Sequence, residues 1–172
     1  MALYLYQISN LAFTSGWSVI PLEIISVTDL VGSSTLNTQQ GPVDILQTPG
    51  PSPIFLILLS SMFMHGSWMH LGGNMLYLWN FGNNVELRFE HLKCIIFYLG
   101  GGLAASAMQI ATNTQGVIPN LGASGAIAGV LGSYPVLFPW NKVNAVFLVR
   151  IISVPAIVVL GMWGVMLFVR GV

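Results

Sequence analysis

Charged side chains are scarce in this sequence of 172 residues: Asp, Glu, Lys and Arg make up 6% of it, and the net charge is zero. A soluble domain carries about 25% charged residues. Hydrophobic residues reach 55%, and the mean hydropathy is +0.79. The shortage of charge excludes an ordinary soluble domain, and the zero net charge gives no reason to expect a nucleic-acid partner. We therefore expect an integral membrane protein in contact with the lipid bilayer.

The sequence also lacks a second cysteine, a secretory signal and any histidine after residue 91. The single cysteine, Cys94, excludes an internal disulfide. Residues 1–13 lack the basic start and small-residue cleavage site of a secretory signal. No histidine follows His91, so any chemistry that needs a histidine has only His65, His70 and His91 to draw on.

The length of each apolar run predicts which segments cross the membrane, because a crossing helix needs roughly 20 residues. Four runs qualify: residues 67–85, a run from 89 or 91 to 111, residues 122–140, and residues 151–169. Residues 53–64 are too short to cross alone and predict an interfacial or re-entrant piece. Residues 1–13 resemble the tail of a span whose beginning is absent, and the chain stops three residues after the last run. We therefore expect a chain that is cut at both ends.

The basic residues predict the orientation. Residues 1–87 contain no Lys or Arg. Four of the five basic residues, Arg88, Lys93, Lys142 and Arg150, fall on one side once the spans alternate; Arg170 is the exception. Loops rich in Lys and Arg are usually cytoplasmic. The other side, with residues 15–51 and the loop 112–120, is then extracytoplasmic.

A serine stands at the start of the run 122–140, among residues without bulk. Gly122, Gly125, Gly129 and also Gly132 recur at spacings of three and four, which is typical of close helix packing in membranes. Packing leaves Ser124 unexplained, since alanine would pack equally well. Ser124 is either an ordinary helix residue or a nucleophile at a helix N-terminus, where free N–H groups favour developing negative charge.

Two polar residues, His70 and Asn74, lie one helical turn apart in the run 67–85. One interpretation is that they hydrogen-bond a neighbouring helix. The other is that both donate hydrogen bonds to an oxyanion during acyl transfer. A metal site is disfavoured, because His65 and His70 lack the HExxH spacing and no carboxylate lies nearby. We expect no metal and no organic cofactor.

Four stretches together resemble the rhomboid family of intramembrane serine proteases, in order and with that family's spacing. They are residues 61–79 (SMFMHGSWMHLGGNMLYLW), 81–86 (FGNNVE), 97–102 (FYLGGG) and 122–129 (GASGAIAG). The resemblance implies a bundle of six helices and a Ser–His dyad that cleaves the membrane helices of other proteins near their outer ends. By the same resemblance, Ser124 is the nucleophile, and His70 and Asn74 are oxyanion donors.

The sequence departs from the family at the general base, which is a histidine on the family's sixth helix. This chain has no such histidine. A serine hydroxyl is a poor nucleophile until a base takes its proton, so the chain as it stands is expected to be inactive. Two explanations compete: a fragment of a complete protease, or a rhomboid-like protein that binds membrane helices without cutting them. A transporter is the weakest alternative, because we find no paired intramembrane charges and no inverted repeat.

The sequence therefore predicts an all-α, polytopic transmembrane bundle, a single rhomboid-like membrane domain over residues 1–172. Part of the first helix and the sixth helix are expected to be absent. The expected function is serine endopeptidase activity on transmembrane protein substrates, with the site toward the extracytoplasmic side.

Overall fold

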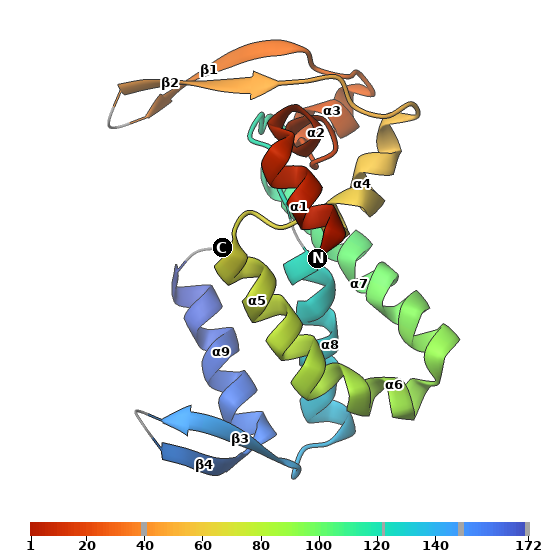
Figure 1. Cartoon of the computed structure of the whole chain (residues 1–172), viewed down its shortest axis with the longest axis vertical. Coiled ribbons are helices and arrows are strands. Elements are labelled where there is room, and N and C mark those ends of the chain that lie inside the picture. Colours follow the sequence, from red (N-terminus) through yellow and green to blue (C-terminus); the bar gives the residue numbers. More distant parts are fainter. Residues whose placement is uncertain (39–40, 122, 148–149, 171–172) are drawn as a thin grey trace.

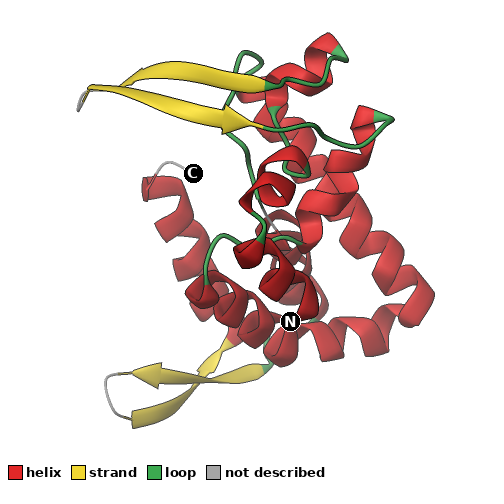
Figure 2. Cartoon of the chain, turned by 45° about the horizontal axis from the view of Figure 1, so that its top comes forward, coloured by secondary structure: helices red, strands yellow, loops and turns green. Residues whose placement is uncertain are grey.

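The computed structural model describes residues 1–38, 41–121, 123–147 and 150–170. Within these ranges the chain is mostly helical, with two β-hairpins at opposite ends of the helical part (Figures 1 and 2). The N-terminal part comprises α1 (Ala2–Ser9), α2 (Leu11–Gly16), α3 (Pro21–Ser26) and the hairpin of β1 (Gly32–Thr38) and β2 (Gly41–Gln47). This part lies at the upper end of the molecule in Figure 1.

The central part begins with three short helical turns, η1 (Ile54–Leu56), α4 (Ile57–Ser60) and η2 (Ser61–Phe63). A continuous helix follows, made of α5 (Trp68–Tyr77), the π-helical turn η3 (Leu78–Gly82) and α6 (Asn83–Phe89). These two stretches meet at an angle of 76°. The predicted helix over residues 67–85 is confirmed, and the short run before it is bent away from it as a re-entrant piece would be.

The remaining helices complete the bundle. They are α7 (His91–Thr112), α8 (Ala123–Leu137) and α9 (Ala156–Arg170), with the hairpin of β3 (Lys142–Phe147) and β4 (Arg150–Pro155) between the last two. Helix α8 lies at the centre, between α5, α7 and α9 (Figure 1). Its buried side chains Ile127, Leu131 and Tyr134 pack with Phe81 and with Leu160 of α9. Asn84 Nδ2 of α6 donates to the Tyr134 hydroxyl at 2.9 Å, which fixes α6 against α8.

The prediction of an all-α chain is wrong in two places. Hairpin β1–β2 occupies part of the segment 15–51 that was expected to be an outer loop. The run 151–169 was predicted to be one helix, but its first five residues lie in β4 and the helix begins at Ala156. Pro155 explains the change, because the residue before a proline is disfavoured in the helical conformation and Pro has no N–H to donate. Hydropathy alone does not distinguish such a strand from the start of a helix.

The N-terminal run also differs from its prediction. Residues 1–13 form two helices rather than the tail of one, because Asn10 ends α1 and begins α2. The Asn10 side chain accepts a hydrogen bond from the Phe13 N–H at 2.9 Å, the usual contact of an N-cap.

One helix within the described ranges, α7, is long and apolar enough to cross a membrane by itself. The bent pair Ile54–Phe63 and Trp68–Phe89 counts as a second crossing if it is taken as one span. Helix α8 is apolar, but its 15 residues are fewer than the roughly 20 that a crossing helix needs. It ends at Leu137, two residues before Pro139.

Candidate functional site

Helix α5 brings His70 and Asn74 onto one face. It begins after Ser67, whose hydroxyl oxygen accepts a hydrogen bond from the His70 backbone N–H at 3.0 Å. Four residues make about one turn, so the two side chains point the same way. His70 is half-buried, and Asn74 is buried with 7% of its surface exposed.

The His70 ring has a defined hydrogen-bond partner. The backbone N–H of Gly66 donates to His70 Nδ1 at 3.5 Å. In a neutral ring whose Nδ1 accepts, the proton sits on Nε2. The geometry therefore favours the tautomer of His70 that offers an N–H from Nε2.

Helix α8 places Ser124 in its first turn, where backbone N–H groups have no partner within the helix. The Ser124 residue is exposed. Its neighbour Gly125 lies against α7 so closely that an added Cβ would stand 2.6 Å from the Cβ of Ala105. Close contact of α7 and α8 thus requires glycine at position 125.

The other glycines of this helix contribute differently. A Cβ at Gly129 would lie 3.5 Å from the Cα of Gly101, an ordinary van der Waals contact, and one at Gly132 would meet open space. Gly122, which was predicted to pack beside the nucleophile, lies outside the described residues.

His70, Asn74 and Ser124 line one pocket of about 270 Å³ between α5 and α8, together with Met69, Tyr77 and Ile127. The structure therefore brings together the three polar residues that the sequence singled out.

The Asn74 carboxamide is the unusual group in this pocket. Its Nδ2 is buried and has no hydrogen-bond partner among the described residues. A buried donor left without a partner costs about 1–3 kcal/mol, so each such group in a native structure calls for an explanation. Asn74 Nδ2 therefore keeps its capacity to donate to a group outside the described structure.

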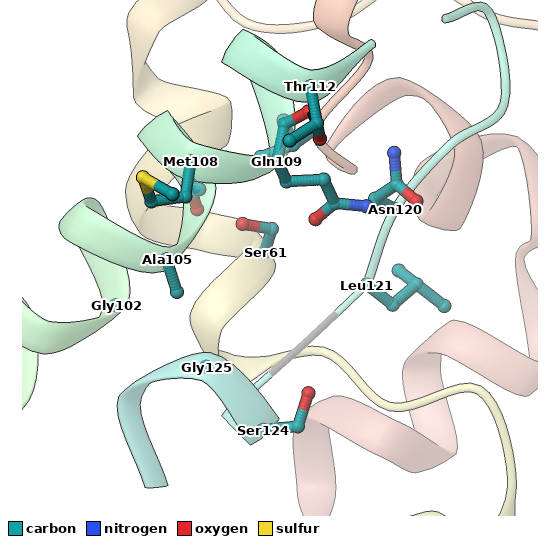
Figure 3. Close-up of a pocket in the computed structure, with 12 residues that line it drawn as sticks. Ser61, Gly102, Ala105, Met108, Gln109, Thr112, Asn120, Leu121, Ser124 and Gly125 are labelled. Atoms are coloured by element: carbon teal, nitrogen blue, oxygen red, sulfur yellow. Dashed lines mark hydrogen bonds between the residues drawn. The ribbon is translucent and has the colours of Figure 1, made fainter. Parts of the chain in front are cut away.

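Ser124 also borders a second, larger pocket of about 430 Å³ between α7 and α8. Ser124 lies at one edge of this pocket, and Gln109 and Asn120 lie at the opposite edge (Figure 3). Ser61 and Ser106 add two more hydroxyl-bearing side chains to its lining. Sequence reasoning missed this pocket, although Gln109, a polar residue inside the apolar run of α7, was a signal of the same kind as Asn74.

The remaining histidines, His65 and His91, do not line either of the two pockets that contain Ser124. His91 pairs with Glu86 at the α6–α7 junction, and its side chain is exposed. His65 is buried in the link before α5, and its ring meets that of His70 edge-on with the centroids 5.5 Å apart. Within the ranges that the structure describes, no three His, Cys, Asp or Glu residues are grouped as a metal site would require.

Comparison with known proteins places the chain in a family. The family model described as the rhomboid domain matches residues 54–172, which is more than half of the chain. The chain belongs to the rhomboid family. Rhomboid proteins are integral membrane proteins, and the family includes serine proteases. All three polar residues of the pocket between α5 and α8 lie within the matched region.

Individual rhomboid relatives resemble shorter stretches. Rhomboid protein 1 of Saccharomyces cerevisiae mitochondria is 36% identical over 90 residues, which are 50% of this chain and 26% of the relative. RHOMBOID-like protein 5 of Arabidopsis thaliana is 36% identical over 76 residues, 44% of this chain and 25% of the relative. Rhomboid protease GluP of Bacillus subtilis is 37% identical over 76 residues, 44% of this chain and 14% of the relative. The matched stretch thus spans about a quarter or less of these curated relatives. No solved structure gives a significant match.

Proposed function

We propose that this chain carries the nucleophile and oxyanion site of an intramembrane serine endopeptidase that cleaves transmembrane segments of other membrane proteins. The observation that carries the proposal is that His70, Asn74 and Ser124 line one pocket, and that the buried Asn74 Nδ2 has no hydrogen-bond partner among the described residues. A donor without a partner, on a residue that lines the same pocket as an exposed hydroxyl, is what an enzyme needs where negative charge develops on a carbonyl oxygen.

In the proposed reaction, Ser124 Oγ attacks the carbonyl carbon of a peptide bond. A C–O bond forms, the carbonyl oxygen becomes an anion, and the Ser124 proton passes to a general base. The anion accepts hydrogen bonds from His70 Nε2, Asn74 Nδ2 and the Ser124 backbone N–H. The anion then collapses, the C–N bond breaks, and the base gives its proton to the leaving amine. Water next attacks the acyl carbon and gives a proton to the base; the bond to Ser124 Oγ breaks, and the base returns the proton to Ser124. No metal or organic cofactor takes part.

The general base in this proposal is a histidine outside these 172 residues, as the resemblance to active rhomboid proteases implies. The described histidines do not suit the task. His91 is held by Glu86 at the α6–α7 junction, His65 does not line the pocket, and His70 is assigned to the oxyanion.

We propose that the protein crosses the membrane several times, with the site near the extracytoplasmic face. The α6–α7 junction and the hairpin β3–β4 carry Arg88, Lys93, Lys142 and Arg150, and both lie at the lower end of the bundle in Figure 1. The first turns of α5 and α8, with His70 and Ser124, lie toward the upper end. The tendency of basic loops to be cytoplasmic supports the assignment of the lower end to the cytoplasm.

Two pockets meet at Ser124, and we assign each of them a different role in the reaction. The pocket with His70 and Asn74 is proposed to hold the scissile carbonyl. The larger pocket, with polar side chains including Gln109 and Asn120, is proposed to hold the water that resolves the acyl-enzyme. A substrate helix must unwind locally before cleavage, because its amides are hydrogen-bonded internally while it stays helical.

The test is covalent labelling of the full-length protein in membranes with a fluorophosphonate probe, alongside cleavage of a model transmembrane substrate. Wild-type protein should be labelled, and Ser124→Ala should abolish both labelling and cleavage. Ser133→Ala is the matched control, since Ser133 is on the same helix, donates to the Val130 carbonyl at 2.8 Å and lines neither of the two pockets that Ser124 borders. Labelling that survives Ser124→Ala would remove this serine from the mechanism.

A second candidate is a membrane-helix binding protein without catalytic activity. The observation in its favour is that the sequence has no histidine after His91 to serve as base. It predicts that the full-length protein associates with a transmembrane substrate and leaves it intact, with no labelling of Ser124 by the probe.

A further inference from the structure

Gln7 joins α1 to the link that precedes α5. Its side chain is buried, with 2% of the residue exposed. The Gln7 Nε2 donates to the His65 carbonyl oxygen at 3.4 Å, and the His65 N–H donates to Gln7 Oε1 at 3.2 Å. One carboxamide thus satisfies both backbone groups of one residue, as a neighbouring strand would. Both bonds are buried, where an unpartnered backbone group costs free energy.

His65 and Gly66 belong to the link 64–67 between η2 and α5. The backbone of this link is not helical. The N–H of Gly66, the residue directly after His65, is the donor to His70 Nδ1. The peptide that Gln7 holds through the His65 carbonyl is the same peptide that carries this N–H. A shift of that peptide would therefore move the donor away from the His70 ring.

We propose that Gln7 is a positioning residue for His70. By fixing the His65–Gly66 peptide, Gln7 keeps the Gly66 N–H directed at His70 Nδ1 and so keeps the proton of the neutral ring on Nε2. The consequence for catalysis rests on the proposed function, in which Nε2 donates to the oxyanion. The connection from Gln7 to the His70 tautomer is a property of this chain and is measurable without turnover.

Docking of α1 alone does not require a carboxamide at position 7. Tyr4 lies on the same face of α1 and is also buried, and its ring packs edge-on against Trp68 with the centroids 4.7 Å apart. A methionine at position 7 would fill about the same volume as glutamine and would leave the His65 N–H and carbonyl without this partner. Tyr4 therefore provides a matched control, since its ring attaches α1 to α5 through Trp68, whereas the hydrogen bonds to the His65 N–H and carbonyl come from Gln7.

The experiment is ¹⁵N NMR of the histidine rings in this chain in detergent micelles, at a pH where His70 is neutral. In the wild type, we expect His70 Nδ1 to resonate as an unprotonated nitrogen and Nε2 as a protonated one. In Gln7→Met, both resonances should move toward each other as the second tautomer becomes populated. Tyr4→Leu should lower the thermal unfolding midpoint and leave the His70 resonances in place.

Gln7→Asn is the variant to use if Gln7→Met does not fold. It keeps the carboxamide but is one methylene too short to reach His65, so the His70 resonances should move in the same direction. Identical His70 resonances in wild type and in a folded Gln7 variant would overturn the inference, as would an equal shift in Tyr4→Leu.

Kinetics of the full-length protein separate this inference from the proposed function. We expect Gln7→Met to lower kcat roughly tenfold with little change in KM, less than the roughly 10²-fold or greater loss that follows removal of an oxyanion donor. An unchanged kcat beside a shifted tautomer would refute the catalytic consequence. If the full-length protein cleaves nothing, the proposed function fails, and the NMR comparison still decides whether Gln7 positions His70.

Discussion

The backbones of Val19 and Asn120 exchange two hydrogen bonds: the Val19 N–H donates to the Asn120 carbonyl at 3.0 Å, and the Asn120 N–H donates to the Val19 carbonyl at 2.8 Å. The Leu22 N–H also donates to the carbonyl of Gly116, in the same loop as Asn120. This loop leads directly to Ser124. The N-terminal segment, which lies outside the region matched to the rhomboid domain, therefore holds the backbone that approaches the candidate nucleophile.

A buried carboxyl group in that segment predicts a pH dependence of stability. Glu23 of α3 is 1% exposed, and it accepts a hydrogen bond from the Leu30 N–H at 3.1 Å. Burial raises the pKa of Glu23 from 4.5 to about 7, and the nearby Asp29 carboxylate adds to the rise, opposed by the bond from Leu30. Below pH 4.5 the group is protonated in both the folded and unfolded states, so it carries no penalty.

As the pH rises from 4.5 to about 7, the unfolded chain releases this proton and the folded chain retains it. The free energy of unfolding should therefore fall over that range, by at most about 3.5 kcal/mol, since one unit of pKa corresponds to about 1.4 kcal/mol. Glu23→Gln, which keeps an acceptor for Leu30, should remove this slope and raise the unfolding midpoint at pH 8. Asp44→Asn, the same change at an exposed residue, should preserve the slope. Parallel pH profiles for wild type and Glu23→Gln would contradict the assignment.

The contact between Gly125 and Ala105 predicts a size limit at the α7–α8 interface. Gly125→Ala should lower the stability of the protein by about 1–3 kcal/mol, the usual cost of overpacking, because its Cβ would stand 2.6 Å from that of Ala105. Gly129→Ala is the matched control, since its Cβ would make only an ordinary contact with Gly101. The measurement is the thermal unfolding midpoint in micelles.

The double variant Gly125→Ala with Ala105→Gly moves the methyl group from one helix to the other and should recover most of the loss. A double variant no more stable than Gly125→Ala alone would show that the clash with Ala105 is not the cause.

The N-cap of α5 predicts a linked loss of stability and activity. Ser67→Ala removes the acceptor for the His70 N–H and should cost about 1 kcal/mol. The first turn of α5 would then fray at the residue that carries the candidate oxyanion donor, so kcat of the full-length protein should fall as well. Ser67→Asp supplies a new acceptor and should restore both quantities. Ser26→Ala, which removes a hydroxyl bonded to the Leu22 carbonyl at the end of α3, should leave kcat unchanged.

The sequence was sufficient to predict the two helices that meet at the pocket and the three polar residues in it. His70 and Asn74 share a face through helical periodicity, and Ser124 stands at a helix start; both are local properties. The contacts of Gln7 with His65 span 58 residues, and the pairing of Val19 with Asn120 spans about a hundred, so no local pattern reveals either of them. The strand before α9 was missed because its residues are as apolar as a helix would be, and apolar length does not determine backbone conformation.

Substitutions of Asn74 and Asn84 should distinguish a residue needed for cleavage from a residue needed for stability. Both residues lie on the continuous helix from Trp68 to Phe89. The Asn84 carboxamide donates to the Tyr134 hydroxyl at 2.9 Å, whereas Asn74 Nδ2 is buried and has no partner among the described residues. Replacing each by leucine, which has a similar volume, should therefore have opposite effects.

Asn84→Leu should destabilise the protein by about 1 kcal/mol, the typical net worth of a hydrogen bond. Asn74→Leu removes an unpaired buried donor, so the unfolding midpoint should stay the same or rise. In the full-length protein, Asn74→Leu should nevertheless lower kcat by roughly 10²–10³-fold, as loss of an oxyanion donor does, and Asn84→Leu should change it much less. If Asn74→Leu stabilises the protein and leaves cleavage unchanged, the Asn74 amide does not stabilise the transition state. An active-site group that costs stability is expected to contribute to activity in return.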